Sequence, residues 1–211
     1  MKFSSRSIQR LLPLFLTSLI ILEAVAYVVT TPSPREGFFE LYALGANGTA
    51  SDYYPNNSTF IQPTQPVTWY VALSNQMGSF QYVDIRVKLG NQTINPPNDT
   101  IASPSPAPLI VEFKRFISDN ATWEIPFVWQ ILNFSTQGNH LRVLQLQIDN
   151  VSYLIQNAPT CPVHGSCSLR FIFELWTWDV SVGDFQIGWR NGNRQRMAWL
   201  QFWFNPTLGA P

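Results

Sequence analysis

Alternation of apolar and polar side chains is the feature that most constrains this fold. In Gln81–Leu89 every second residue from Val83 onward is Val, Ile or Leu, and the positions between them are Asp, Arg and Lys. The same period runs through Val67–Ser74 and through Thr122–Leu132, where Trp, Ile and Phe share one face. A period of two places all the apolar side chains on one side of a β-strand. Another layer must cover that side, which predicts packed sheets.

Turn residues between these runs predict how the strands connect. The segment Asn75–Phe80 contains a glycine, so we expect Val67–Ser74 and Gln81–Leu89 to form an antiparallel hairpin. A second hairpin is expected around the turn 118–122, between Leu109–Phe116 and Thr122–Leu132. Further strands are predicted at Phe38–Leu44, Leu141–Asp149, Leu169–Val180 and Met197–Phe204, and at Val151–Gln156, where a short helix is the alternative. About eight to ten strands predict an all-β fold, an immunoglobulin-like antiparallel β-sandwich preceded by one N-terminal helix.

Prolines and glycines predict the irregular parts of this domain. The segment Asn95–Pro108 is rich in proline, which removes backbone donors, and it is expected to be a long exposed loop. Pro126 predicts that its strand lies at a sheet edge or contains a bulge. The pair Asn191-Gly192 is typical of a hairpin turn.

The first 36 residues differ from the rest of the chain. Lys2, Arg6 and Arg10 precede residues 11–29, which contain no Lys or Arg. An apolar helix of this length just crosses a bilayer. Residues 11–29 are therefore interpreted as a transmembrane signal-anchor, with residues 1–10 in the cytoplasm and the remainder outside the cell.

A cleaved signal peptide is the alternative for the same segment. The triplet Ala24-Val25-Ala26 fits a cleavage site, which would release the domain from the cell, and Glu23 disfavours a buried span. Under either interpretation residues 30–36 form a short stalk, 37–205 the extracellular β-sandwich domain and 206–211 a tail.

Composition excludes one class of partner. Only 12% of residues are charged and the formal net charge is zero, while 14% are aromatic. A protein that neutralises phosphates needs a basic surface, so no nucleic-acid partner is expected.

Glycosylation motifs support export. About two Asn-x-Ser/Thr triplets are expected by chance from 15 Asn and 31 Ser or Thr. The chain has eight, none with Pro in the middle and all beyond the apolar segment, so glycosylation is predicted on the exported side. The acceptor residues are Asn47, Asn56, Asn57, Asn91, Asn98, Asn120, Asn133 and Asn150.

The two cysteines, Cys161 and Cys167, are predicted to form a disulfide that closes a small loop. The alternative is a metal site formed by these cysteines with His164, as in an exported copper-handling domain. A blue-copper site also needs a second His and usually a Met, and His140 is the only other histidine in the chain. No metal and no cofactor are therefore predicted.

Residues for catalysis are sparse. Neither a metalloprotease motif nor a phosphate-binding glycine loop occurs. Pairs of acids such as Asp179 and Asp184 could be imagined as a glycosidase acid and base, but twelve acids scattered over the exported region always allow such a choice. The more suggestive residues are tryptophans, which could form an exposed platform for a sugar or a protein partner, or pack in the core. The candidate aromatic face consists of Trp176, Trp178, Trp199 and Trp203.

Three stretches of the sequence resemble a known family. They are "FFELYALGANGTASDYYPN", "SDNATWEIPFVW" and "RMAWLQFWFNPT", and together they resemble an archaeal envelope family catalogued as domain of unknown function, family 1616. The resemblance implies a membrane-anchored protein with an exported domain, and it implies no catalytic residues. Members of that family often have several spans, whereas this chain has one candidate, and "SNQMGS" replaces a family segment that contains His.

The sequence therefore predicts a non-enzymatic cell-surface module with a structural or partner-binding role. Its expected partners are the membrane, through residues 11–29, and other envelope proteins or glycans. The first alternative is a carbohydrate-binding or glycan-processing accessory that uses the tryptophan face. The copper-handling domain is the second.

Overall fold

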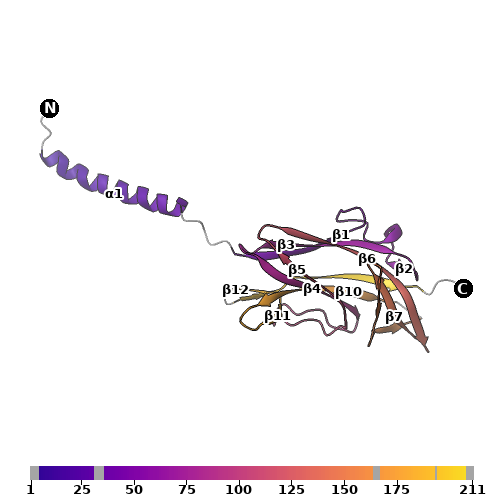
Figure 1. Cartoon of the computed structure of the whole chain (residues 1–211). Helices are drawn as coiled ribbons and strands as arrows, with labels where there is room; N and C mark the ends of the chain where they lie inside the picture. Colours follow the sequence, from indigo (N-terminus) through magenta and orange to yellow (C-terminus); the bar gives the residue numbers. More distant parts are fainter. Residues whose placement is uncertain (1–4, 31–35, 164–166, 193, 208–211) are drawn as a thin grey trace. The chain divides into compact units, whose positions relative to one another are not determined.

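The computed structural model describes residues 5–30, 36–163, 167–192 and 194–207 (Figure 1). The chain divides into two compact units, Met1–Glu36 and Gly37–Pro211. The first contains one helix, α1 (Ser5–Thr30), at the place where the sequence predicts one. The predicted stalk, residues 30–36, falls largely outside the described residues.

The prediction of a transmembrane segment over residues 11–29 requires a long apolar helix. In the part of the chain that the structure describes, no helix is long and apolar enough to cross a membrane.

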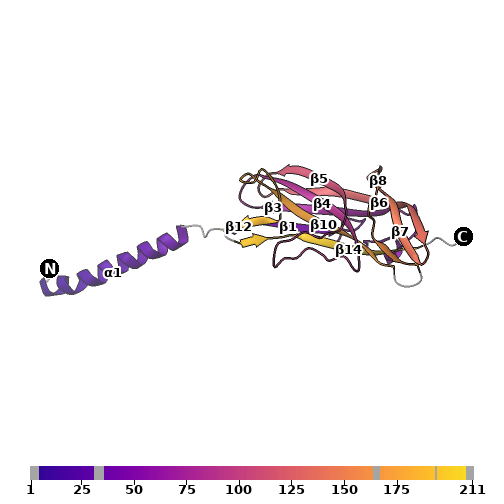
Figure 2. The same ribbon diagram turned by 90° about the horizontal axis from the view of Figure 1, so that it is seen from below.

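The second unit consists of two antiparallel sheets packed face to face, so the predicted all-β sandwich is confirmed (Figures 1 and 2). Its described residues contain fourteen strands, more than the expected eight to ten, because several strands have only two to four residues. The first sheet has the order β1 (Phe38–Leu44), β3 (Val67–Gln76), β6 (Thr122–Gln137), β7 (His140–Ile148) and β8 (Val151–Leu154), and β9 (Thr160–Pro162) also pairs with β7.

The second sheet has the order β2 (Phe60–Ile61), β14 (Trp199–Pro206), β10 (Leu169–Asp179), β4 (Gln81–Asn91) and β5 (Leu109–Ile117), and β11 (Asp184–Ile187) pairs with β10. The pair β14–β2 is parallel, and the others are antiparallel. A separate hairpin consists of β12 (Trp189–Asn191) and β13 (Arg194–Arg196), and one 3-10 turn, η1 (Pro55–Asn57), precedes β2.

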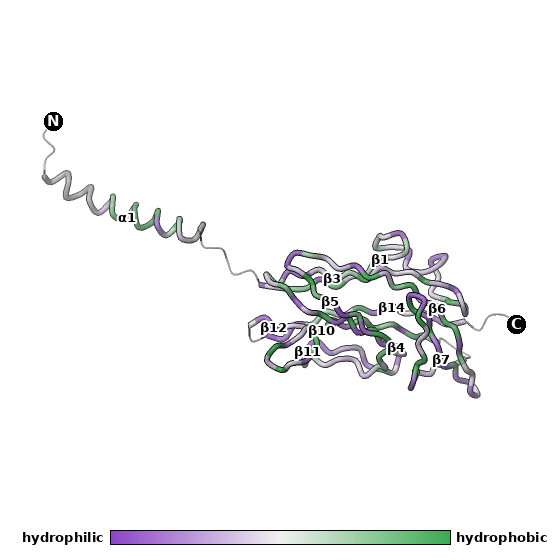
Figure 3. The backbone as a smooth tube through the Cα atoms, viewed as in Figure 1, coloured by the Kyte–Doolittle hydropathy of each residue, from purple (hydrophilic) through white to green (hydrophobic). Residues whose placement is uncertain are grey.

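Aromatic side chains fill the space between the sheets. Trp69 of β3 is fully buried and stacks on Phe202 of β14, with ring centroids 4.6 Å apart. Its indole Nε1 donates to the carbonyl oxygen of Tyr53 at 2.5 Å. Hydrophobic and hydrophilic residues alternate along the strands (Figure 3), and the inward residues of both sheets form one core. The high aromatic content of the sequence is therefore used mainly in packing.

Both predicted hairpins are wrong, although the strands themselves are confirmed. β3 belongs to the first sheet and β4 to the second, and the connection between β5 and β6 crosses between the sheets in the same way. Asn75 links the β3–β4 and β5–β6 connections, because its Nδ2 donates to the carbonyl oxygens of Ser79 at 2.9 Å and of Ile117 at 3.0 Å. An alternating strand followed by a short turn looks the same whether the next strand pairs with it or faces it across a core, so the pattern could not separate the two.

Two smaller expectations hold. Pro126 lies in the first part of β6, which pairs with β3 but not yet with β7, so its missing N–H faces no neighbouring strand. A bulge follows further along β6, at Ile131–Phe134. Gly192, with φ of 57°, lies in the turn that joins β12 to β13, as the Asn-Gly pair predicts.

Candidate functional site

The outer face of the second sheet holds the most unusual chemistry of the domain. On β4 and β10 the inward positions are aliphatic or Phe, and the outward positions include four charged residues with little or no exposure: Asp84, Lys88, Arg170 and Glu174. Charged groups are rarely buried unless they are paired. Something must therefore cover this face and supply partners.

The cover is the connection between β4 and β5, residues 92–108, which we call the strap. Its Ser105 N–H donates to Glu174 Oε1 at 2.7 Å, and its carbonyl oxygen accepts from Lys88 Nζ at 2.6 Å. Lys88 and Glu174 also form an ion pair at 2.9 Å. The strap contains the segment expected to be a long exposed loop. Most of that segment is an exposed loop, as expected, but Ser105 and Ala107 are buried against the sheet.

The four candidate tryptophans all lie on this outer face, but three of them are engaged. The Arg86 guanidinium lies 3.8 Å above the Trp176 ring, and that of Arg170 lies 4.6 Å from the Trp203 ring. Trp199 Nε1 donates to Asp99 Oδ1 of the strap at 2.9 Å. Trp178 is different, with 40% of its surface exposed.

Trp178 belongs to a group of aromatic side chains that the sequence analysis missed. We call this group the aromatic strip: Phe80, Tyr82, Phe116, Trp178 and Phe185. Register brings it together, because Tyr82 is opposite Phe116 on β5 and Trp178 is opposite Phe185 on β11. The signal in the sequence was the outward position of Tyr82 in an alternating strand, but pairing across four strands could not be read from it.

Ring geometry within the strip shows which surfaces remain open. Phe116 stacks on Tyr82 with ring centroids 4.1 Å apart and on Phe80 with centroids 5.4 Å apart. Phe80 and Phe116 nevertheless remain more than half exposed. Val180 and Val182, in the turn after β10, extend the exposed apolar surface. Patches of this kind on a folded domain are typical of interaction sites.

A charged cluster borders the strip. Arg86 Nε contacts Asp84 Oδ2 at 2.9 Å and Glu112 Oε1 at 3.0 Å, and Lys114 Nζ contacts Glu112 Oε2 at 2.8 Å. Burial raises the pKa of Asp84 to about 6, whereas the hydrogen bond from Lys114 lowers the pKa of Glu112. Asp84 has no exposed surface, so its carboxyl group cannot reach a substrate.

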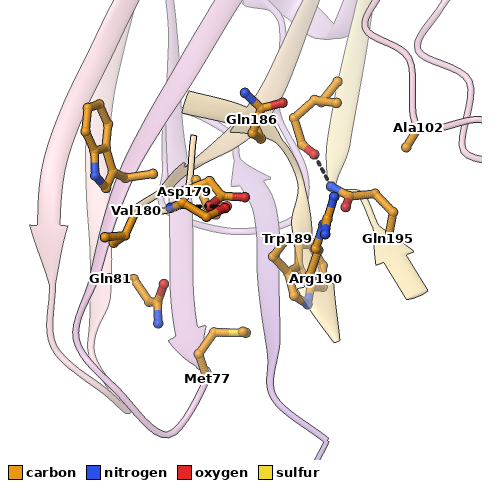
Figure 4. A pocket seen from close by; sticks show the side chains of 13 residues that line it. Met77, Gln81, Ala102, Asp179, Val180, Gln186, Trp189, Arg190 and Gln195 are labelled. Atoms are coloured by element: carbon orange, nitrogen blue, oxygen red, sulfur yellow. Dashed lines mark hydrogen bonds between the residues drawn. The ribbon is translucent and has the colours of Figure 1, made fainter. Parts of the chain in front are cut away.

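A pocket of about 620 Å³ lies beside Trp178 (Figure 4). Figure 4 shows Gln81 and Val180 on one side of it and Trp189, Arg190 and Gln195 on the other. The remaining lining residues are Met77, Ala102, Thr177, Trp178, Asp179, Ser181, Gln186 and Ile187. The volume lies within the range of small-molecule sites.

Gly188 places the far wall of this pocket. Its φ is 68°, and a Cβ there would lie only 1.8 Å from the carbonyl oxygen of Arg196. Its own N–H donates to the Leu175 carbonyl at 2.8 Å, and its carbonyl accepts from Thr177 Oγ1 at 2.6 Å. Glycine thus allows the chain to turn sharply from β11 into β12 and to place Trp189 against the core.

The two acids considered as a catalytic pair, Asp179 and Asp184, lie opposite each other across the β10–β11 hairpin. Asp179 Oδ1 accepts hydrogen bonds from the hydroxyl and N–H of Ser181, and these lower the pKa of Asp179. Asp184 Oδ1 accepts from the N–H of Phe185 at 2.7 Å. Both carboxylates therefore hold the turn.

The predicted disulfide between Cys161 and Cys167 is confirmed, with Cα atoms 4.9 Å apart. The third proposed metal ligand, His164, lies outside the described residues. Among the residues that are described, no group of three or more His, Cys, Asp or Glu could hold a metal ion.

Seven of the eight glycosylation motifs have an exposed Asn: Asn47, Asn56, Asn57, Asn98, Asn120, Asn133 and Asn150. Asn91 is buried, and its Nδ2 donates to the Thr160 carbonyl at 3.0 Å while its Oδ1 accepts from Thr93 and Ile94. A glycan on Asn91 is incompatible with this arrangement, and an occupied Asn91 in the native folded protein would contradict it.

No protein-family model matches the chain, and no curated protein matches it at significant similarity.

Proposed function

We propose that residues 37–205 form an exported, non-enzymatic immunoglobulin-like module that binds a partner in the cell envelope through the aromatic strip. The observation that carries the proposal is the exposed apolar surface of Phe80, Phe116 and Trp178. Aromatic residues are enriched in protein interfaces and supply large contact areas there.

Strand order supports the immunoglobulin-like classification. The order β1-β3-β6 corresponds to strands A, B and E, and β14-β10-β4-β5 corresponds to G, F, C and C′. One departure is that β7 follows the E-like strand in sequence, where an immunoglobulin domain has strand D before it. A second is that the disulfide is local and does not join the B-like and F-like strands, β3 and β10.

Pairing of the acids supports a non-enzymatic role. On the outer face Asp84, Glu112 and Glu174 each form an ion pair with Arg or Lys, and Asp179 caps a turn. A general acid or base needs access to a substrate and a suitable pKa. Asp84 has a raised pKa but no exposure, so it is better suited to a structural role.

Export and envelope location form part of the proposal. The disulfide and the excess of glycosylation motifs support an oxidising compartment. Residues 11–29 would either retain the domain at the cell membrane or be removed near Ala26. Membership of the archaeal envelope family that the opening motif resembles, family 1616, is proposed on the same basis.

Chemical crosslinking on intact cells tests this function. Full-length protein with Phe116→Ser and Trp178→Ser should lose a crosslinked partner that the wild type retains. The matched control is Leu154→Ser on β8, which changes a side chain that is 78% exposed on the other sheet. Protease added to the cells before crosslinking should remove the domain, and the crosslinked product should then be missing. Equal crosslinking by the strip variant, or protection of the domain from protease, would refute the proposal.

A further inference from the structure

Strand β5 leaves one backbone edge without a partner strand. It lies at the end of the second sheet, and in the part of the chain that the structure describes it pairs only with β4 (Figure 2). Of the four strands at the ends of the two strand orders, β5 has nine residues, β1 seven, β8 four and β2 two. Folded proteins usually keep such edges short, because their unpaired N–H and C=O groups can accept a further strand. The long edge of β5 is therefore a candidate interaction surface.

Apolar side chains of β5 also reach this edge. Phe116 is 57% exposed and Leu109 is 49% exposed. Phe113 packs against the core, with its ring centroid 6.4 Å from that of Phe127, yet it is only partly buried. An added strand would bury more of these side chains, and burial of apolar surface stabilises such pairing.

Charged residues on β5 indicate which strand would fit. Glu112 and Lys114 lie on the outer face, where Glu112 contacts Arg86 and Lys114. They flank Phe113, so the segment Glu-Phe-Lys is complementary in charge to the same segment running in the opposite direction. In an antiparallel second copy with Phe113 opposite Phe113, Glu112 lies opposite Lys114 twice, once on each side of the two-fold axis. Opposite charges directly across a strand pair stabilise it.

The same two charges disfavour the neighbouring registers. A two-fold axis normal to the sheet keeps the outer faces of both copies on one side, so only shifts that preserve the alternation are allowed. The next allowed register in one direction places Glu112 opposite Glu112, and in the other it places Lys114 opposite Lys114. Like charges directly opposite each other are destabilising. The edge of β1 offers no comparable match, because Glu40 is its only charged residue.

The selected register also uses a regular part of the strand. It pairs residues 111–115 of one copy with 115–111 of the other. Ile110, which has no partner on β4 at a bulge, lies outside this range. Within each copy the cluster of Asp84, Arg86, Glu112 and Lys114 has two acids and two cations, so joining two clusters leaves a neutral group.

We infer that two copies of this chain form a symmetric dimer in which their β5 strands pair antiparallel about Phe113. The two second sheets then become one continuous sheet. The inference goes beyond the proposed function, because it uses the edge of β5 and leaves Trp178 available to an envelope partner. An interface formed mainly by one strand pair is small, so we expect a dissociation constant on the order of 10 μM.

The test measures energy transfer between donor-labelled and acceptor-labelled full-length chains in detergent, with micelles in excess over protein. Glu112→Lys alone and Lys114→Glu alone each place like charges opposite each other twice. We expect each variant to weaken self-association about tenfold or more. A mixture of the two variants restores both attractive pairs, so its members should associate within about threefold of the wild-type affinity.

Two controls accompany these variants. Glu40→Lys makes the same charge change on β1, at an edge of the first sheet, and should associate as the wild type does. Trp178→Ser changes the strip without changing β5 and should also associate as the wild type does. Circular dichroism confirms that each variant is folded.

Three outcomes would overturn the inference. They are wild-type chains that stay monomeric up to about 100 μM, single variants that associate as strongly as the wild type, and a mixture no stronger than either variant alone. The proposed function is tested separately, because crosslinking of an envelope partner that depends on Trp178 would persist in all three cases.

Discussion

The outer face of the second sheet has a covered half and an open half, and the same strand supplies both. On β10, Glu174 has no exposed surface, while Trp178, four residues further along the same face, is 40% exposed. The covered half lies under the strap and contains the Lys88–Glu174 pair, and the open half is the aromatic strip. Alternation decides which side of a sheet a residue faces, but the connections decide whether that side meets solvent. Burial on an outer face therefore has to be read from loops.

The largest expected effect comes from breaking the covered half. Lys88→Met leaves Glu174 buried without its cation, and we expect a loss of about 3–5 kcal/mol in the free energy of unfolding. Urea denaturation monitored by tryptophan fluorescence measures it. The comparison variant is Lys114→Met, which removes a partly exposed partner of Glu112 and should cost less than about 1 kcal/mol. Similar losses in both would mean that the strap does not seal this pair from solvent.

A smaller effect concerns Asp84, at the border between the halves. Its pKa is 3.8 in the unfolded reference and about 6 in the fold, so the folded protein holds this proton more tightly. Protonation of Asp84 therefore contributes about 2–3 kcal/mol to the free energy of unfolding. This contribution is fully present below about pH 4 and is lost as the pH rises through about 6. Asp84→Asn should remove this decline.

Glu112→Gln provides the contrast for the pH experiment. The pKa of Glu112 is lowered in the fold, so its contribution is present above pH 4.5 and disappears as the pH falls further. Urea midpoints measured at several pH values for wild type and both variants separate the two windows. An Asp84→Asn profile parallel to that of the wild type between pH 4 and pH 7 would show that Asp84 titrates normally.

The smallest effect compares two tryptophans of the two halves. Trp199→Phe removes the hydrogen bond to Asp99 of the strap and should cost about 1 kcal/mol. Trp178→Phe loses no such bond among the described residues and should lie within about 0.5 kcal/mol of the wild type. Thermal unfolding of both variants checks this, and equal destabilisation would contradict the assignment of Trp178 to the open half.

Sequence periodicity predicted the strands well because it depends on local geometry alone. β1 has the predicted bounds, and β4 and β10 differ from them only at their ends. The pairing of the strands could not be predicted where it depended on contacts between residues distant in the sequence. Asn75, which bridges two crossings separated by more than forty positions, gives no signal in a single sequence.

The candidate site was only partly predictable for a related reason. The sequence placed the tryptophans in pairs on strand faces but left open whether those faces lie outside or in the core. The arginines above Trp176 and Trp203 come from β4 and β10, so their stacking depends on register. The strip combines Phe116 of β5 with Phe185 of β11, a strand that the sequence did not reveal. Trp189 follows the Gly188 turn, and its burial against the core could not be predicted from the sequence.

Pairing of β2 with β14 has a consequence for the timing of folding. Asn205 N–H donates to the Thr59 carbonyl, and the Tyr54 hydroxyl donates to the carbonyl of Trp203. Residues near the start of the domain therefore form these contacts with residues almost 150 positions later in the chain. Burial raises the pKa of Tyr54 to about 12, which shows how closed this junction becomes. Contacts of such separation make folding slow. Until β14 has been synthesised, the edges of β2 and β10 remain unpaired. A chain emerging from a ribosome or an export channel therefore stays incomplete until its last strand arrives.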